Sequence, residues 1–452
     1  MKNKTILFLG AGATHALGMP MTDDQRQIFL RYFFQDYRIQ NSAANESHAK
    51  RLLNREKDED TKLLCKYVKA FFTEKSFTIM DFYNLIDMQI RLGRTCCIDN
   101  GDHIGVPEAM KIRKAMLVLL QELFSMYTEE AMGTEKEKAL ENFKNFFKDL
   151  AQLCLEEKRA MLSDPHLDPC SSDFLISNLS YISMNWDILF IWCMFIAHKE
   201  LNDRNSDHYV IHGKNVKLKI FNDFATFMAA RKPGYDMEDN LNIKRWYPYN
   251  ESVATRINDP EHLYDRIITL IRTYLPHGST NWLECPECGK LSMYLGNAWE
   301  LHSPSIAMEK GKEYRCLHCQ SPMTTADSSM LLQTVYKEKT SYMEEIQQDM
   351  RLRIHEAKRI VFIGYSLPDD DIEYRSMFTY NNAQIKKEAY VVLYDAHAAS
   401  NDWLCFTDLY SVISDENKRT AQRFTDVFGE DNVRFNFKGF PNAKDKILEI
   451  LQ

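Results

Sequence analysis

Four cysteines in two pairs have the most specific spacing of potential ligand residues in this sequence. Cys285 and Cys288 form one C-x-x-C pair, and Cys316 and Cys319 form a second pair after 27 intervening residues. Two such pairs are typical of a tetrahedral zinc site, because each tight turn presents two thiolates to the metal. Four thiolates fill the coordination shell, so the sequence predicts a structural zinc ion and not a catalytic one.

A glycine turn near the start of the chain could bind a phosphate. The apolar run Thr5–Leu9 predicts a short buried strand, the segment Gly10-Ala11-Gly12 breaks it, and Ala13–Leu17 begins a helix. This arrangement favours an anion, because glycine lets the backbone approach closely and the first amides of a helix are unpaired. His15 occupies the place of the third glycine of the usual dinucleotide fingerprint, so a plain strand and tight turn is the alternative.

Polar side chains also follow a second predicted strand, Leu179–Met184. An apolar helical run begins at Asp187, so Asn185 and Asp187 should lie at the carboxyl end of that strand, where open α/β sheets bind ligands. The alternative is that Asn185 turns the chain and Asp187 caps the helix.

The elements that must position these residues alternate between strand and helix in the last third of the chain. Strands are predicted over Arg359–Tyr365, Ala389–Tyr394 and Val433–Phe440. Asp395 follows the second of them, where a carboxylate could accept hydrogen bonds from ribose hydroxyls. The acidic run 369–371 is more simply a solvated helix start. The predicted class is therefore α/β, a Rossmann-like parallel sheet with helices on both faces, a small zinc-ribbon module and a large helical insertion.

The predicted domain organisation is discontinuous. We expect the Rossmann-like domain to comprise residues 1–24, 171–200 and 323–452, interrupted by a helical insertion (25–170), an irregular insertion (201–270), a His-Gly segment (271–284) and the zinc module (285–322). The helical insertion has an aromatic stripe, which we expect in the core or at a subunit interface: Phe143, Phe146, Phe147 and Leu150.

Composition limits the class of protein. The net charge of −8 over 452 residues argues against a generic nucleic-acid-binding surface. No signal peptide is visible, and no apolar run reaches the roughly 18 residues needed to span a bilayer. The 11 cysteines, without an export signal, suggest reduced thiols, so we expect a cytoplasmic protein with no membrane association.

Five motifs occur in a characteristic order: GAGATHALGMP, MNWD, HGS leading into the two C-x-x-C pairs, GYSLPDDD and VVLYD. Together they resemble the sirtuin superfamily, and GYSLPDDD is most similar to its bacterial sirtuin-like branch, found in anti-phage defence systems. The resemblance covers about half of the chain, and the segments 22–170 and 201–265 lie outside it.

The resemblance implies NAD as substrate and assigns roles by position. Asn185, in a motif with Asp187, positions a water or the nicotinamide-bearing ribose, and His277 is the catalytic base acting on ribose. His277 is preferred to His212, the other His-Gly histidine, because only His277 precedes a serine and the cysteine pairs. The implied cofactor-binding residues are Gly10, Ala11, Gly12, Thr14, Gly364, Ser366 and Asp395.

Departures from the family pattern favour cleavage of NAD itself. The arginine expected after the first turn is absent, and Met184 replaces the glutamine before Asn185. Both changes weaken the case for protein deacylation. The sequence therefore predicts an NAD glycohydrolase that releases nicotinamide and ADP-ribose as a regulated defence effector. The alternatives are an NAD-dependent deacylase and a non-catalytic NAD or ADP-ribose sensor. We expect a homo-oligomer formed through residues 22–170, an ATPase or other defence protein as partner, and no direct nucleic-acid binding.

Overall fold

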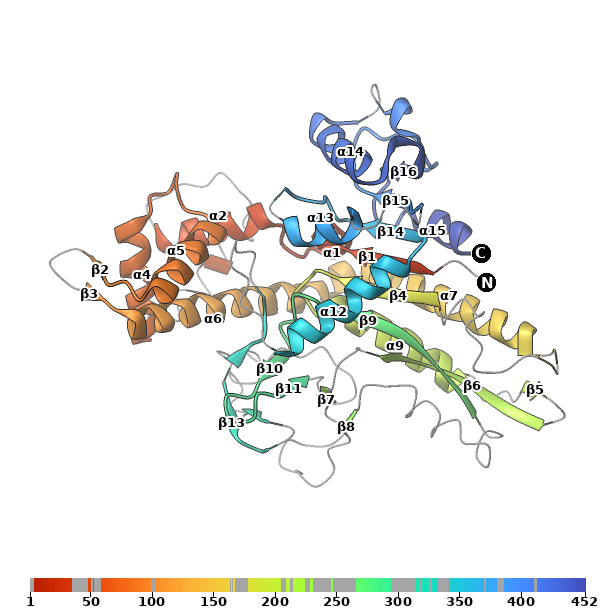
Figure 1. Ribbon diagram of the computed structural model, residues 1–452, viewed down its shortest axis with the longest axis horizontal. Helices are drawn as coiled ribbons and strands as arrows, with labels where there is room; N and C mark the ends of the chain where they lie inside the picture. Colours follow the sequence, from red (N-terminus) through yellow and green to blue (C-terminus); the bar gives the residue numbers. More distant parts are fainter. Residues whose placement is uncertain are drawn as a thin grey trace.

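The polypeptide is organised around one eight-stranded sheet (Figure 1). The computed structural model describes residues 4–34, 48–49, 52, 58–98, 103–162, 164, 166, 178–204, 209–211, 214–223, 228–230, 245–246, 266–293, 314–316, 319–324, 327–331, 341–369, 371–379, 386–409 and 413–452. In spatial order the strands are β16 (Val433–Asn436), β15 (Glu388–Val392), β14 (Arg359–Ile363), β1 (Thr5–Leu9), β4 (Leu179–Ser183), β9 (Arg266–Tyr274), β6 (Lys214–Asp223) and β5 (Tyr209–Ile211).

Every neighbouring pair of strands in this sheet is parallel except β6 and β5. The chain leaves β1 towards β4 and leaves β14 towards β15, so the two connections diverge from the boundary between β1 and β14. At such a switch point the loops after the two strands separate and leave a crevice, which is where open α/β sheets bind ligands. The topology therefore directs attention to the loops after β1, β4 and β14.

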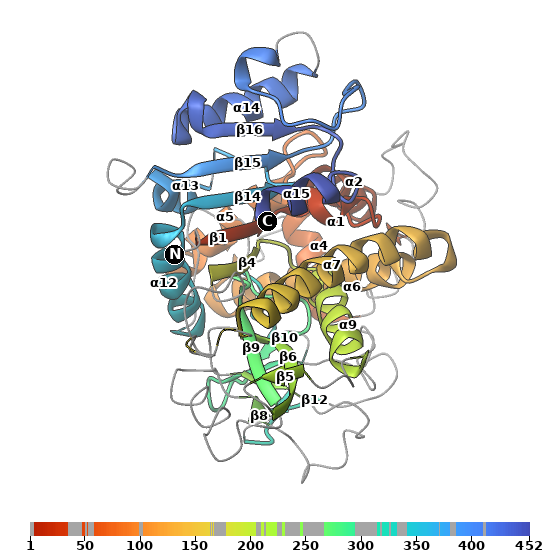
Figure 2. The same ribbon diagram turned by 90° about the vertical axis from the view of Figure 1, so that its right-hand side faces the viewer.

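Helices cover both faces of the sheet, which confirms the predicted α/β class. Alternation along the strands sends Tyr181 of β4 to one face, where its ring lies 5.8 Å from Phe147 of α7 (Glu137–Leu162) and 5.9 Å from Phe190 of α9 (Leu189–Arg204). Phe8 of β1 points to the other face and packs 5.6 Å from Phe378 of α13 (Ile372–Thr379). Figure 2 shows α7 crossing in front of the strands.

The segment after the glycine turn is helical where the structure describes it. It contains α1 (Ala11–His15), α2 (Thr22–Phe33), α4 (Glu59–Phe71), α5 (Ile79–Leu92) and α6 (Val106–Ala131), with a short hairpin of β2 (Cys96–Cys97) and β3 (His103–Ile104). Capping defines the helix starts: the Thr78 hydroxyl accepts from the Asp81 amide at 2.9 Å, and Glu108 accepts from the Gly105 amide at 3.1 Å.

The aromatic stripe of α7 does not supply a subunit interface. Phe143, Phe146, Phe147 and Leu150 are all buried within the chain. Phe143 and Phe146 each place their rings 4.9 Å from Phe440, which follows β16. The α7 helix therefore belongs to the layer covering the sheet, and its stripe gives no support to the predicted homo-oligomer, which stays a prediction for residues 22–170.

The interpretation of residues 201–270 as an irregular insertion is wrong for its described parts, because β5, β6 and the start of β9 lie within it and join the main sheet. Polar residues concealed the pattern: in β6, Leu218, Ile220 and Asn222 are buried on alternate positions, and in the sequence Lys217 and Lys219 flank Leu218. His212 lies outside the described residues.

Short strands build the cysteine-bearing module beneath the main sheet in Figure 1. These are β7 (Met228–Ala230), β8 (Arg245–Trp246), β10 (Trp282–Glu284), β11 (Leu291–Met293), β12 (Tyr314–Arg315) and β13 (Pro322–Met323). The chain then forms α12 (Ser341–Glu356) and later α14 (Asp415–Phe428) and α15 (Lys444–Leu451).

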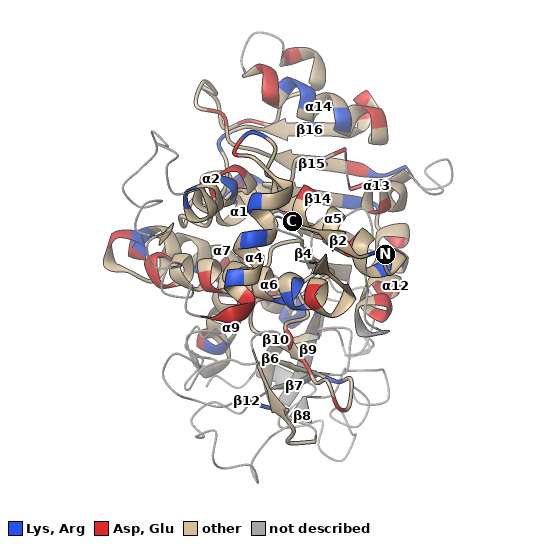
Figure 3. Ribbon diagram, turned by 90° about the vertical axis from the view of Figure 1, so that its left-hand side faces the viewer, with Lys and Arg blue, Asp and Glu red and all other residues tan. Residues whose placement is uncertain are grey.

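Charged residues of both signs are spread over the described helices (Figure 3). Acidic and basic segments alternate along the described helices in Figure 3, in keeping with the small net charge. None of the helices among the described residues combines the length and the apolar character needed to cross a bilayer.

Candidate functional site

The glycine turns after β1 and β14 lie against each other at the switch point. The Gly10 amide donates to the Ile363 carbonyl and the Gly12 amide to the Gly364 carbonyl, each at 2.9 Å. Gly364 has φ of 62°, and a Cβ added there would lie 2.1 Å from the Ala13 nitrogen. These glycines are therefore required for the close approach of the two turns.

The glycine turn after β1 differs from the anion site that the sequence suggests, because its backbone amides already have partners. The amides of Gly10, Gly12 and Ala13 all donate to backbone carbonyls, and α1 is only five residues long. So short a helix has a weak dipole, because few peptide units align in it. Phosphate binding at this turn stays a prediction, and any charge compensation must come largely from side chains. Lys136 and Lys138 line the same cleft.

Three buried side chains form a hydrogen-bonded relay between β1 and β4. The Thr14 hydroxyl donates to Asp187 Oδ2 at 2.9 Å and accepts from Asn185 Nδ2 at 3.2 Å. Because the single hydroxyl proton goes to the carboxylate, the amide nitrogen of Asn185 must face Thr14. The Asn185 carbonyl oxygen has no hydrogen-bond partner among the described residues, and Asn185 lines both cavities of the site. Asn185 therefore presents an acceptor to a ligand.

Asp187 has two roles. Its Oδ1 accepts from the Leu189 amide at 3.1 Å and so caps α9, as the alternative interpretation of the sequence expected. Burial raises the pKa of the Asp187 carboxyl to about 6, and the hydrogen bonds from Thr14 and the backbone limit that rise. The carboxylate is mostly ionised at neutral pH, and it is a buried negative charge directly behind Asn185.

His277 lies beyond the carboxyl end of β9, next to the strand that carries Asn185. Its Nδ1 lies 3.2 Å from the Met184 carbonyl, which can only accept, so Nδ1 carries the proton and Nε2 is the basic nitrogen of the neutral ring. The ring also packs edge-on against Tyr374, 5.2 Å away. The structure thus brings His277 and Asn185 to the same place, as the order of motifs suggested.

The backbone at position 278, directly after this histidine, requires a glycine. Its φ is 72°, and an added Cβ would lie 2.2 Å from the Ser329 carbonyl oxygen. Around it, the Leu331 amide donates to the His277 carbonyl at 2.9 Å and Trp186 Nε1 donates to the Leu331 carbonyl at 2.9 Å. The chain on both sides of the cysteine module therefore holds the histidine in position.

A cleft of about 1120 Å³ runs over the switch point. At one end lie Asn185 and His277, and at the other lie the residues after β15, including Asp395. The predicted residues Gly10, Ala11, Gly12, Gly364 and Ser366 line the cleft between these ends. Thr14 lies behind the cleft and lines a second, smaller cavity.

Asp395 is engaged by the protein itself. Its Oδ2 accepts from the Ser414 amide at 2.7 Å and from Asn417 Nδ2 at 2.8 Å, and its Oδ1 accepts from the His397 amide at 2.9 Å. Burial opposes ionisation, but these hydrogen bonds prevail and hold the pKa of Asp395 at about 2. The carboxylate organises the loops at this end of the cleft, and one further lone pair on Oδ1 can accept another hydrogen bond.

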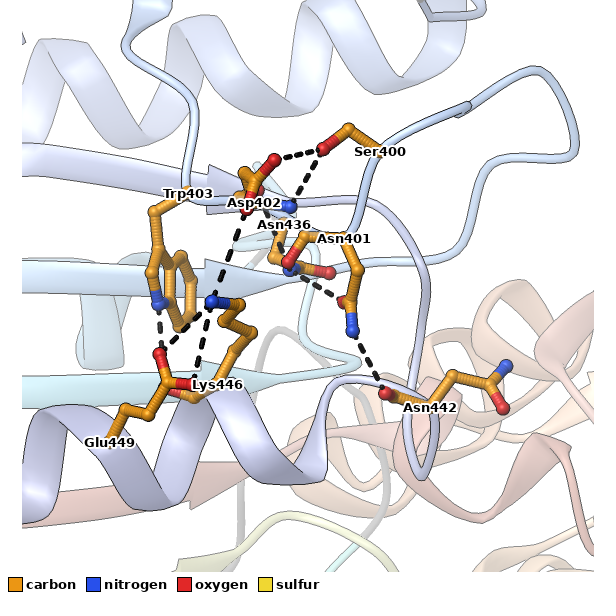
Figure 4. A network of polar contacts seen from close by, with 8 residues as sticks. All are labelled: Ser400, Asn401, Asp402, Trp403, Asn436, Asn442, Lys446 and Glu449. Carbon is orange, nitrogen blue, oxygen red and sulfur yellow. Dashed lines mark hydrogen bonds and ion pairs between the residues drawn. The ribbon is translucent and has the colours of Figure 1, made fainter.

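A polar network supports the same end of the cleft (Figure 4). Asn436 Nδ2 donates to the Asn401 carbonyl at 2.8 Å, and Asn401 Nδ2 donates to the Asn442 carbonyl at 3.3 Å. Trp403 Nε1 donates to the Lys446 carbonyl at 3.4 Å. Since Asn442 lines the cleft, this network fixes part of the cleft wall to β16 and α15.

The acidic run at the start of α13 is only partly a solvated helix start. Asp371 is buried and accepts from the Tyr365 hydroxyl at 2.8 Å. Asp369 is exposed and pairs with Arg375 at 2.9 Å. Asp370 lies outside the described residues.

The four cysteines meet in one cluster that could hold a metal ion. All four Sγ atoms lie within 4.8 Å of one another, with 3.5 Å between Cys285 and Cys319 and 3.6 Å between Cys288 and Cys316. Zinc–sulfur bonds of about 2.3 Å place tetrahedral sulfurs about 3.8 Å apart. The observed separations match that geometry, so the cluster fits a structural zinc ion.

The two cysteine turns close in the same way. The Gly289 amide donates to the Cys285 carbonyl at 2.8 Å, and the Gln320 amide donates to the Cys316 carbonyl at 3.0 Å. Gly289 and Gln320 both have φ of 65°. Two equivalent turns from separate hairpins are what a shared tetrahedral metal requires.

A second cavity of about 90 Å³ lies behind the cleft and shares Asn185 and His277 with it. Tyr83 and Phe124, from α5 and α6, form part of its wall. No pattern in the sequence predicted these residues at the site, because they reach it only through the packing of helices that lie far away along the chain.

Comparison with known proteins adds no identification: no family model matches the chain, and no curated protein is similar to it.

Proposed function

We propose that the protein hydrolyses NAD to nicotinamide and ADP-ribose, as the resemblance to sirtuin-like NADases suggests. The observation that carries the proposal is the position of Asn185 and His277. Both line a cleft of about 1120 Å³ and also a small cavity beside it. A dinucleotide in the cleft would place its reacting sugar beside these two side chains.

The residues have the chemistry that this hydrolysis requires. The free carbonyl oxygen of Asn185 can orient a water beside the anomeric carbon, and Nε2 of His277 can accept a proton from that water or from a ribose hydroxyl. As water attacks, the bond between the anomeric carbon and the ring nitrogen breaks, and its electron pair leaves with nicotinamide. The ionised Asp187 lies behind Asn185 and favours the positive charge that develops on the sugar.

A structural zinc ion in the cysteine cluster is part of the same proposal. When bound, it would be held by Cys285, Cys288, Cys316 and Cys319, and would stabilise the fold of the module. Its influence on the reaction would be indirect, since the chain flanking the module contacts the His277 segment.

The defence role, an ATPase or other defence partner, and regulation by assembly are supported by the resemblance alone. Cleavage of NAD is separable from them and can be tested on purified protein.

The test is to incubate the protein with NAD, with and without an acylated peptide, and to follow nicotinamide release by chromatography. We expect release without the peptide, and near-complete loss of it in Asn185→Ala and His277→Ala, with the double variant little worse. His212→Ala should keep activity. Release only with the peptide would indicate a deacylase, and binding without turnover would indicate a sensor.

A further inference from the structure

The small cavity is built partly from the helical segment that the family resemblance does not cover. Ile79, Met80 and Tyr83 of α5 and Phe124 of α6 line it together with Asn185, Trp186 and His277. With about 90 Å³, it has room for a single ring and not for a second nucleotide. A ligand cleaved beside Asn185 would therefore place one small group here and the remainder in the cleft.

Tyr83 is the distinctive member of this wall. Its side chain is 1% exposed, and its hydroxyl has no hydrogen-bond partner among the residues that the structure describes. The ring is fixed from behind, because the Arg113 guanidinium lies 5.9 Å from its centroid and is itself paired with Asp87 at 2.6 Å. A buried hydroxyl without a partner is costly, so its presence needs a reason.

A second buried polar atom without a hydrogen-bond partner among the described residues belongs to another residue that lines the same cavity. The Asn185 carbonyl oxygen can only accept a hydrogen bond, whereas the Tyr83 hydroxyl can donate one. Apolar side chains make up most of the remaining lining, among them Met19, Ile79, Met80 and Phe124. The other polar lining residues are Thr14, Thr22, Gln25, Asp187 and His277. Such a cavity is complementary to a planar ring that carries one hydrogen-bond-accepting substituent.

We infer that Tyr83 is a specificity-determining residue, whose hydroxyl donates a hydrogen bond to the exocyclic carbonyl of the leaving heteroaromatic ring. The inference rests on the proposed function for the identity of that ring, since nicotinamide carries a carbonyl on a six-membered ring. It assigns to the helical segment a direct part in recognition of the substrate.

The test compares three rings against wild-type protein and Tyr83→Phe. Nicotinamide and 3-acetylpyridine carry the carbonyl, and pyridine lacks it. Binding is measured as inhibition of NAD cleavage and, independently of activity, as the shift in melting temperature that each ring produces. Tyr67→Phe is the matched control, because it removes a buried hydroxyl of the same helical segment that bonds to Gln89 and does not line the cavity.

We expect the wild type and Tyr67→Phe to bind the two carbonyl-bearing rings more tightly than pyridine by roughly three- to tenfold, the worth of one neutral hydrogen bond. Tyr83→Phe should lose this preference and keep its melting temperature, since no protein hydrogen bond is removed. A preserved preference in Tyr83→Phe, no preference in the wild type, or a melting temperature lowered by several degrees would overturn the inference. Absence of NAD cleavage by the wild type would refute the proposed function instead, and the melting-temperature shifts would still decide the role of Tyr83.

Discussion

Replacing Thr14 by valine tests the relay that orients Asn185. Valine has nearly the shape of threonine but lacks the hydroxyl, so packing is retained while both relay hydrogen bonds are lost. Asp187 Oδ2 then loses its donor at 2.9 Å, and Asn185 Nδ2 loses its acceptor at 3.2 Å. Nothing in the relay then distinguishes the two ends of the Asn185 amide.

The size of the effect follows from burial. Thr14, Asn185 and Asp187 are 1%, 6% and 2% exposed, so water cannot easily replace the lost partners. A hydrogen bond to a buried charged group contributes about 1.5–3 kcal/mol, and an unpaired buried amide costs about 1–3 kcal/mol. We expect Thr14→Val to lower the free energy of unfolding by about 2–4 kcal/mol, and kcat by roughly ten- to a hundredfold if Asn185 is misoriented. The pKa of Asp187 should also rise, since the Thr14 hydrogen bond lowers it.

The assay is nicotinamide release under saturating NAD, together with urea unfolding of the same samples. Thr14→Ser is the control, because serine keeps the hydroxyl and loses only a methyl group. It should retain kcat within about fivefold and most of the stability. If Thr14→Val kept wild-type kcat, or if Thr14→Ser lost as much as Thr14→Val, the hydroxyl would not orient Asn185 and the relay would be wrong.

Four further outcomes are expected. Cys316→Ser should remove zinc, measured by elemental analysis, and lower both the melting temperature and NAD cleavage, because the chain flanking the module holds His277; full zinc content in the variant would contradict this. Gly278→Ala should destabilise the fold by about 2 kcal/mol or more in urea unfolding, because the left-handed backbone and the 2.2 Å approach to Ser329 leave no room for Cβ. Gln320→Gly should stabilise the zinc-bound protein by up to about 1 kcal/mol, since φ is 65° there. Because the pKa of Asp187 is raised to about 6 in the folded state, the folded state binds this proton more tightly than the unfolded state does, which favours folding below about pH 4. This contribution is lost as pH rises through about 6, so the free energy of unfolding of the wild type, relative to Asp187→Asn, should fall by about 3 kcal/mol over that interval. NAD cleavage should increase over the same interval with an apparent pKa near 6.

The main sheet could be predicted where strands are continuous apolar runs. Thr5–Leu9 and the strands that became β4 and β14 are almost wholly buried, which favours apolar side chains at successive positions. The strands that became β15 and β16 are buried at most positions, with Glu388 exposed and Tyr390 and Arg434 half-buried. The strand β6 was missed because its lysines alternate with its buried residues in a segment that also contains turn residues. The cysteine cluster was predicted because metal coordination constrains both residue type and spacing.

The internal contacts of the candidate site could not be predicted. The sequence favoured a phosphate as the reason for Gly10 and Gly12, whereas the structure shows that both glycines are needed for contact with Gly364, more than 350 positions away. Likewise, Asp395 satisfies three donors of its own chain. The glycine contacts and the Asp395 hydrogen bonds both depend on which loops meet at the switch point. The pattern of residues within one segment does not show which loops meet.

The role of the helical segment between β1 and β4 differs most between the sequence prediction and the structure. Its aromatic stripe was expected in the core or at a subunit interface, and Phe147 packs on Tyr181 and Phe190 of the same chain. The same segment supplies Tyr83 and Phe124 to the cavity behind Asn185. A helical region that both covers the sheet and completes the candidate site cannot be removed without exposing the core and opening the site. A change in the position of α5 or α6 relative to β4 would therefore alter the cavity behind Asn185 directly.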